Sequence, residues 1–230
     1  MTSQTKKSIL VCAIIALIVL LDQSLKIFIH SYFDLYQSVE ITPWFVLCYV
    51  ENNGMAFGVE WFSKLALTLF RIIAVGALGW YIHSLIKHNW RTSYLVMLAL
   101  ITAGAVGNII DCMFYGIIWD YAPFMYGKVI DMLYFPLIHN SAGEVIFFRP
   151  VFNIADTAIT TAIFIVLLFF RHDFNNSFEA IKTPPTESMQ DQQEQTTDAL
   201  EQQDEEQNDE KQNDEEQNDE EQNDEKQQDE

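Results

Sequence analysis

The chain has 230 residues, 50% of them apolar, and a formal net charge of −19. Residues 1–171 carry ten basic and ten acidic side chains, whereas residues 172–230 carry 22 acidic and three basic ones. The low isoelectric point is therefore a property of the tail, and no basic patch suits a nucleic-acid partner. The sequence also lacks a phosphate-binding glycine loop and an HExxH zinc motif, and its three scattered cysteines exclude a disulfide framework.

The first predicted element is an apolar helix over residues 8–29, preceded by two lysines. Its length is sufficient to cross a bilayer. A cleaved signal peptide is the alternative, but no small-residue cleavage site follows the apolar run. Asp22 and Lys26 are four residues apart, so they share a helix face and are predicted to form a structural ion pair near the end of the span.

Residues 31–63 are predicted to form an outer loop that contains a small sheet or a short helix. The segment 39–50 is rich in β-branched and aromatic residues, which predicts a strand interrupted at Pro43. The segment 51–54 has the composition of a turn. Aromatic content of this kind is typical of the headgroup level of a membrane.

Two further spans are predicted at residues 64–87 and 92–112. Gly76 and Gly79 in the earlier span predict close contact with another helix. Arg71 is unexpected inside a span, and it indicates either a side chain that faces the bundle interior or a later start of the span.

A second long and aromatic loop covers residues 113–150, and its apolar content favours a functional loop over a disordered one. A fourth span is predicted at residues 151–171, with Pro150 placed as a helix-start residue. From residue 204 the chain repeats a five-residue acidic unit without apolar residues. We therefore expect a membrane domain over residues 1–171 and a disordered acidic tail over residues 172–230.

The placement of lysine and arginine predicts the orientation in the membrane. One set of loops and tails holds most of these residues: Lys6, Lys7, Lys87, Arg91, Arg171 and Lys182. The positive-inside rule puts that side in the cytoplasm, together with both termini, and both aromatic loops on the outer face. The expected fold class is an all-α membrane protein with four transmembrane helices and a small extracytoplasmic β or loop subdomain.

Two aspartates near the outer ends of the spans are the candidates for chemistry. Asp131 lies in the second loop, and Asp156 lies at the mouth of the fourth span, in the stretch Phe152–Asp156. Two neighbouring carboxyl groups share a proton, because one of them acquires a raised pKa. The ionised member can activate water for attack on a peptide carbonyl, and the protonated one can polarise that carbonyl. The sequence does not decide which aspartate holds the proton.

Five short blocks, taken together in this order, resemble the signal peptidase II family, the prolipoprotein signal peptidases of bacteria. They are Asp22-Gln23-x-x-Lys26, Asn53-Gly54-Met55-Ala56-Phe57, Gly104-Ala105-x-Gly107-Asn108-x-x-Asp111, Val129-Ile130-Asp131 and Phe152-Asn153-Ile154-Ala155-Asp156. The resemblance covers about residues 7–171. It implies an aspartic membrane endopeptidase in which Asp131 and Asp156 are the catalytic dyad.

The resemblance also implies a substrate, a diacylglyceryl-modified prolipoprotein that is cut before its lipidated cysteine. It further implies a place in the bacterial inner membrane, sensitivity to globomycin-type inhibitors, and no metal or cofactor; one chain holds both aspartates, so a monomer suffices. Substrate-binding or supporting roles are implied for Asn53, Gly54, Asn108, Asp111, Asn153 and Ala155. Structural roles are implied for Asp22, Lys26, Gly104 and Gly107.

Three departures from the family pattern stand out. Cys112 occupies the place of the usual arginine, which raises the question of whether Lys128 or Arg149 supplies the cation for Asp111. Ala103 precedes Gly104, where the family has a glycine pair. The segments 113–127 and 132–150 are long, and we expect them to be insertions that gate substrate access.

Two other functions are compatible with acidic residues in a membrane protein. A small proton-coupled transporter could use Asp131 and Asp156 as a relay, although the sequence has no matching halves. A membrane scaffold could instead recruit basic partners through its acidic tail, in which case replacing either aspartate would be harmless.

Overall fold

The computed structural model describes residues 2–53, 64–141, 144–147 and 150–182. Contacts divide the chain into two units, Met1–Glu179 and Ala180–Glu230. The predicted boundary at residue 171 therefore falls eight residues earlier than this division. Nearly all described residues belong to the first unit, and the candidate residue Gly54 lies outside the described ranges.

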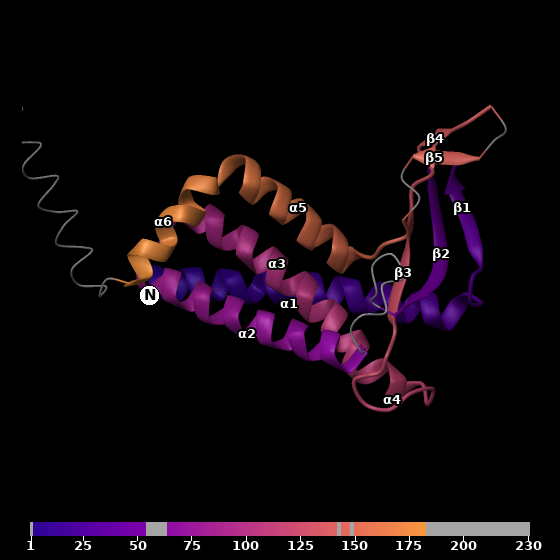
Figure 1. Cartoon of the computed structure of the whole chain (residues 1–230), viewed down its shortest axis with the longest axis horizontal. Coiled ribbons are helices and arrows are strands. Elements are labelled where there is room, and N and C mark those ends of the chain that lie inside the picture. Colours follow the sequence, from indigo (N-terminus) through magenta and orange to yellow (C-terminus); the bar gives the residue numbers. More distant parts are fainter. Residues whose placement is uncertain (1, 54–63, 142–143, 148–149, 183–230) are drawn as a thin grey trace, which may run out of the picture. The chain divides into compact units, whose positions relative to one another are not determined.

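Four long helices of the first unit lie side by side, with a small sheet beyond one end of them (Figure 1). The helices are α1 (Ser3–Tyr32), α2 (Lys64–Lys87), α3 (Thr92–Ile110) and α5 (Ile154–Phe169). Helix α3 is central, because it packs against each of the other three. Its apolar residues are accordingly buried on several faces.

By length and composition, three described helices can cross a membrane: α1, α2 and α3 with its continuation to Ile118. The continuation consists of a π-helical turn, η2 (Asp111–Tyr115), and a short helix, α4 (Gly116–Ile118). The third span is thus longer than the predicted 92–112. A π-helical turn inserts one residue into the helical repeat, and such turns are frequent at functional sites.

The fourth span differs most from its prediction. Helix α5 has 16 residues, roughly 24 Å, which is shorter than a hydrocarbon core of roughly 30 Å. Phe170 leaves the helical conformation, and helix α6 (Arg171–Lys182) continues at an angle of 87°. The two helices meet the criteria for a span only as a bent pair.

Helix α6 also occupies the first residues of the segment that was predicted to be disordered. The physical reason is a buried anchor, because the hydroxyl of Ser177 is hydrogen-bonded to the hydroxyl of Tyr81 on α2. Phe174 and Phe178 are four residues apart, so α6 also presents an aromatic face. These contacts join α6 to the helices, which the polar composition of the segment did not indicate.

The sheet consists of three antiparallel strands in the order β1 (Ser38–Thr42), β2 (Phe45–Asn52) and β3 (Val129–Tyr134). A two-stranded ribbon, β4 (Ile138–His139) and β5 (Val145–Phe147), follows. The strand interrupted at Pro43 is confirmed, because the chain turns there between β1 and β2. The fold class is as predicted: a mostly helical membrane protein with a small antiparallel sheet.

An apolar cluster fastens the sheet to the helix ends. It joins Ile29 of α1 and Tyr115 of η2 to Tyr49, Ile130 and Met132 of the strands, and all five are buried. Such burial stabilises the junction at roughly 25 cal/mol per Å² of apolar surface. Strand β3 is thereby held over the end of the bundle.

Two glycines of α3 permit its central position. A Cβ atom on Gly104 would collide with the carbonyl oxygen of Ala155, and one on Gly107 would lie 2.8 Å from a carboxylate oxygen of Asp22. Both glycines therefore permit the close approach of α3 to its neighbouring helices. Gly76 and Gly79 do not, because an added Cβ on either would meet no described atom within 4 Å.

Candidate active site

Strand pairing positions the first candidate, Asp131. Val50 of β2 lies opposite Asp131, and Asn52 lies opposite Val129. Asp131 is only 2% exposed, and the side-chain amide of Asn52 donates a hydrogen bond of 3.0 Å to its Oδ2. Sequence reasoning missed Asn52 as a site residue, because its only signal was a polar side chain at a strand end.

The start of α5 links Asp131 to the second candidate, Asp156. Asn153 is the N-cap of this helix, and its side-chain oxygen accepts a hydrogen bond of 2.8 Å from the backbone N–H of Asp156. The amide nitrogen of the same fully buried side chain donates a bond of 2.7 Å to Oδ1 of Asp131. One capping residue therefore fixes both aspartates.

Asn108 of α3 holds the carboxyl group of Asp156. Its side-chain nitrogen donates a hydrogen bond of 2.8 Å to Oδ1 of Asp156. Its oxygen accepts from Lys26 Nζ at 3.1 Å and from the side chain of Asn153 at 3.2 Å. Because both ends of the amide are engaged, its orientation toward Asp156 is determined.

Asp156 is accessible, unlike Asp131. It lines a cavity of about 340 Å³ at the start of α5. The other lining residues are Pro150, Phe152, Thr157, Thr160 and Thr161. A group that enters this cavity reaches the carboxyl group of Asp156 directly.

The two aspartates differ in their electrostatic environment. Burial of Asp131, and secondarily the negative charge of Asp156, raise the pKa of Asp131 to about 7. Hydrogen bonds from Asn52 and Asn153 oppose this rise, because they stabilise the ionised form. The raised pKa therefore favours the protonated form of Asp131 up to near-neutral pH.

A second group of buried charges lies beside the first. Nζ of Lys26 is 2.7 Å from Asp22 Oδ2 and 2.6 Å from Asp111 Oδ2, and the three side chains are at most 1% exposed. The predicted pair between Asp22 and Lys26 is present. Lys26 is also the cation of Asp111, whereas Lys128 pairs with Glu51 at 2.6 Å. The compensation suggested for Lys128 was therefore wrong, and Arg149 lies outside the described residues.

Hydrogen bonds tie this buried group to the site. Oδ1 of Asp22 accepts from the backbone N–H of Ala155 at 2.9 Å, next to Asp156 in the chain. Gln23 donates to Oδ1 of Asp111 at 2.9 Å. Helix α1 thus holds the first turn of α5 in place, which gives Ala155 a supporting position.

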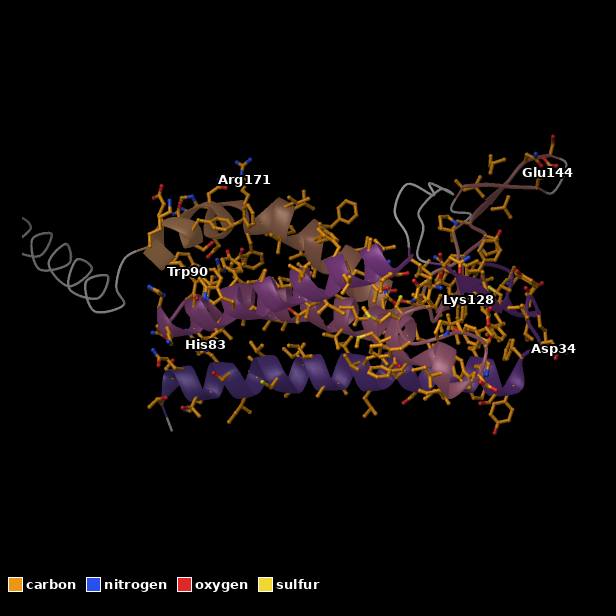
Figure 2. The ribbon with its side chains drawn as sticks, turned by 60° about the horizontal axis from the view of Figure 1, so that its bottom comes forward. Asp34, His83, Trp90, Lys128, Glu144 and Arg171 are labelled. Carbon is orange, nitrogen blue, oxygen red and sulfur yellow. The ribbon has the colours of Figure 1, made fainter. Side chains whose placement is uncertain are left out.

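Asn53 and Arg71, also singled out from the sequence, have described contacts outside the aspartate pair. Oδ1 of Asn53 accepts a hydrogen bond of 3.3 Å from Nζ of Lys64, so its described contact is with α2. Nη1 of Arg71 donates to the sulfur of Cys112 at 3.3 Å, which confirms that Arg71 faces the bundle interior. Figure 2 shows Lys128 at the end of the molecule that carries the sheet, whereas Arg171 lies on the opposite half of the helices.

Fold and site together define a class of protein. At one end of the membrane helices lie two linked carboxyl groups, one on strand β3, buried and with a raised pKa, and one on α5, facing a cavity. Within the described residues, no three His, Cys, Asp or Glu side chains gather as metal ligands do. These features are those of a membrane-embedded aspartic hydrolase.

Comparison with known proteins identifies the family of this chain. The family described as "Signal peptidase (SPase) II" matches residues 14–171. A lipoprotein signal peptidase of Porphyromonas gingivalis is 36% identical over 206 residues, which cover 79% of this chain and 91% of that protein. The lipoprotein signal peptidase of Chlorobaculum tepidum is 35% identical over 159 residues, with 67% and 90% covered.

Solved structures agree with the sequence relatives. A bacterial membrane enzyme determined at 2.3 Å superimposes with a TM-score of 0.56 and 26% identity, covering 72% of this chain and 90% of that one. A second, at 1.9 Å, gives a TM-score of 0.53 and 25% identity, with 69% and 90% covered. The chain belongs to the signal peptidase II family and is an aspartic endopeptidase of bacterial multi-pass membrane type. The transporter and scaffold hypotheses are therefore not retained.

Proposed function

We propose that Asp131 and Asp156 are the catalytic pair with which this enzyme removes the signal peptide from diacylglyceryl-modified prolipoproteins. The observation that carries the proposal is the link through Asn153, whose side chain binds Asp131 and whose capping position fixes Asp156. The family, and the lipoprotein signal peptidases related to this chain, support the prolipoprotein as substrate.

The geometry supports a division of roles between the two aspartates. Asp156, which faces the cavity, takes a proton from water while the water oxygen attacks the carbonyl carbon before the lipidated cysteine. Asp131, with its pKa raised to about 7, donates its proton toward the carbonyl oxygen. Asp156 then passes its proton to the cysteine nitrogen as the C–N bond breaks, and one hydroxyl group of the tetrahedral intermediate returns its proton to Asp131. The released signal peptide keeps the water oxygen in its new carboxyl group.

Asparagine side chains position this pair. Asn108 aims the carboxyl group of Asp156, and Asn52 and Asn153 hold Asp131. Their neutral amides orient the carboxyl groups without supplying a cation, which would favour ionisation of both carboxyl groups. Asn53 and Gly54 belong to the substrate-facing part of the first loop in this proposal.

An aromatic row supports a lipid-bearing substrate. Phe152 lines the Asp156 cavity and stacks on Phe135 at 5.7 Å, and Phe135 stacks in turn on Phe45 at 5.0 Å and Trp44 at 6.2 Å. Trp44 is 56% exposed. Such a row suits the membrane interface, and acyl chains held there would contribute about 0.8 kcal/mol per buried methylene.

The topology belongs to the same proposal. Both termini are cytoplasmic in the inner membrane, and the aspartates face the outer side, because basic residues concentrate near the termini and the loop 88–91. The enzyme works as a monomer without cofactor or nucleic acid, surrounded by membrane lipids, and a globomycin-type peptide would bind at the aspartates. Gating by the segments 113–127 and 132–150 stays a prediction.

The test is cleavage of a synthetic diacylglyceryl-modified precursor by the purified full-length protein in the presence of a chelator. Asp131→Asn and Asp156→Asn should each lower the rate at least about a thousandfold, because each removes one half of the proton transfer. Asp120→Asn, which changes an exposed acid outside the site, is the matched control and should leave the rate unchanged.

Three outcomes would contradict the proposal. Cleavage by a folded Asp131→Asn or Asp156→Asn protein at the wild-type rate would remove the pair. Loss of wild-type cleavage on chelation would show that a metal is required. Equal cleavage of a precursor without the diacylglyceryl group would remove the lipid from substrate recognition.

A further inference from the structure

A second cavity lies away from the aspartates, between α2, α3, α5 and α6. Its volume is about 720 Å³, and its lining is almost wholly apolar. The proposed catalytic step uses none of its residues. Its lining includes Ala77, Tyr81, Leu98, Ile163, Leu167 and Phe178.

One face of α5 connects the two cavities. Asp156 and Thr160 line the cavity at the candidate site, and Ile163 and Leu167 line the second one. Successive members of this series are three or four residues apart, so they form a single stripe along the helix. Ile163 and Leu167 are 42% and 64% exposed, which leaves their apolar surface without a partner inside the chain.

The wall of the cavity opposite α5 is formed by α2. Helices α2 and α5 both pack on α3, and α2 and α5 are not packed against each other along their described lengths. The wall on α2 presents Ala74 and Ala77, and Leu98 of α3 forms part of the floor. Small residues on a membrane helix permit a close approach by another helix.

The separation of the cavities matches the length of a signal peptide. Leu167 follows Asp156 by eleven residues, roughly 16 Å along α5. The apolar segment of a signal peptide has about 7–15 residues, or roughly 10–22 Å as a helix. An apolar helix whose end lies at Asp156 therefore reaches the second cavity.

Helix α6 closes the far end of this path. It turns away from α5 by 87° and places Phe174 and Phe178 in the cavity lining. Tyr81 holds it there, because its hydroxyl bonds both to Ser177 and, at 3.0 Å, to Tyr94. The end of the cavity is thus a fixed wall.

We propose that the second cavity binds the N-terminal part of the apolar helix of the signal peptide, and that α6 limits the length of helix that can be cleaved. This site rests on the proposed function, because its occupant is the part of the precursor that ends at Asp156. It adds a length-selective subsite to the reaction.

Two adjacent leucines test the subsite. Leu167 lines the cavity and Leu168 does not, yet their exposures are similar, 64% and 68%. Leu167→Trp should lower kcat/KM at least about tenfold for a precursor whose apolar segment has about 15 residues, and less for one of about 8 residues. Leu168→Trp should leave both rates unchanged. Equal effects of the two variants would overturn the subsite.

Cross-linking gives a readout that does not depend on turnover. A photo-reactive phenylalanine analogue at position 167 should capture the precursor about eleven residues before the scissile bond, a distance set by the helical rise. The same analogue at position 168 should capture phospholipid. Capture of phospholipid alone at position 167 would show that the cavity is a lipid site and would overturn the proposal.

The wall formed by α6 has its own test. Phe178→Ala should raise the cleavage of precursors with apolar segments longer than about 15 residues, because it deepens the cavity. Phe164→Ala, at a 62% exposed aromatic residue outside the cavity lining, is the control. If the wild-type protein cleaves the precursors, but Phe178→Ala and Phe164→Ala depend in the same way on the length of the apolar segment, only the proposed role of α6 is refuted. If the wild type cleaves none of them, the proposed function fails as well.

Discussion

Two pairs of acidic side chains lie close together in this molecule and differ in one respect. Asp22 and Asp111 enclose Lys26, whose nitrogen lies within 2.7 Å of both, and none of the three is more than 1% exposed. Asp131 and Asp156 are linked by asparagine amides instead. One cation bridges the first pair, whereas neutral amides bridge the second.

The difference separates a group of charges suited to a structural role from a pair of carboxyl groups suited to proton transfer. Lys26 bridges two buried carboxyl groups, one on its own helix α1 and one at the end of α3, and Asp22 also binds the backbone of α5, so this group is suited to holding α1, α3 and α5 together. Without a cation, burial and the neighbouring charge raise the pKa of Asp131 to about 7. Asn108 connects the two groups, because it accepts from Lys26 and donates to Asp156.

The largest effect is expected from removing the cation. Lys26→Met leaves Asp22 and Asp111 buried without a cation, and we expect a loss of about 3–5 kcal/mol of stability. Thermal unfolding in detergent measures it. Lys64→Met, at a half-buried lysine outside the ion group, is the control and should change stability by less than about 1 kcal/mol. Equal losses in both variants would contradict the special role of Lys26.

The next effect is a stability change that depends on pH. Because the pKa of Asp131 is raised from 3.8 to about 7, the folded state binds the extra proton, and stability is lost as pH rises through this range. Asp131→Asn should remove this loss, with a gain at pH 8 relative to pH 4 of at most about 4 kcal/mol. Parallel pH dependence of unfolding in the variant and the wild type would refute the raised pKa.

Loss of the shared capping residue Asn153 should moderately reduce both the stability of the protein and its rate of cleavage. Asn153→Ala removes the N-cap of α5 and one hydrogen bond to Asp131, so we expect about 1 kcal/mol less stability and about a hundredfold slower cleavage. Thr2→Ala, which removes only the N-cap of α1, should cost similar stability but no activity. Unchanged cleavage by Asn153→Ala would show that the cap does not position the pair.

The smallest effect concerns the pH profile. Asn52 lowers the pKa of Asp131 through its hydrogen bond, so Asn52→Ala should raise that pKa. If protonated Asp131 is required, the alkaline limb of kcat/KM against pH should move to higher pH. Movement to lower pH would indicate that the ionised form of Asp131 is the active one.

Local patterns were sufficient to predict some of this architecture. The apolar runs predicted α1, α2 and α3, and the spacing of Asp22 and Lys26 predicted their ion pair. These features depend on neighbours within one turn or one helix. The side chains of Asp131 and Asp156 were also recognised as a pair, although their catalytic role stays a proposal.

Features that depend on packing between distant segments were not accessible. The register of β2 against β3 brings Asn52 to Asp131, and the approach of α1 to α3 brings Lys26 to Asp111. Gly76 was predicted to lie at a helix contact, but the sequence alone does not distinguish a glycine at a helix contact from an exposed one. The bend before α6 likewise depends on the anchor between Tyr81 and Ser177.

One measurement tests the contrast between the two acid groups most directly. Cleavage of the diacylglyceryl-modified precursor and the melting temperature are recorded together for Asp111→Asn and Asp131→Asn at pH 8. We predict that Asp131→Asn loses at least about a thousandfold in cleavage without a lower melting temperature, and that Asp111→Asn melts lower but cleaves within about tenfold of the wild type when folded. Retained cleavage by Asp131→Asn, or abolished cleavage by folded Asp111→Asn, would contradict the account.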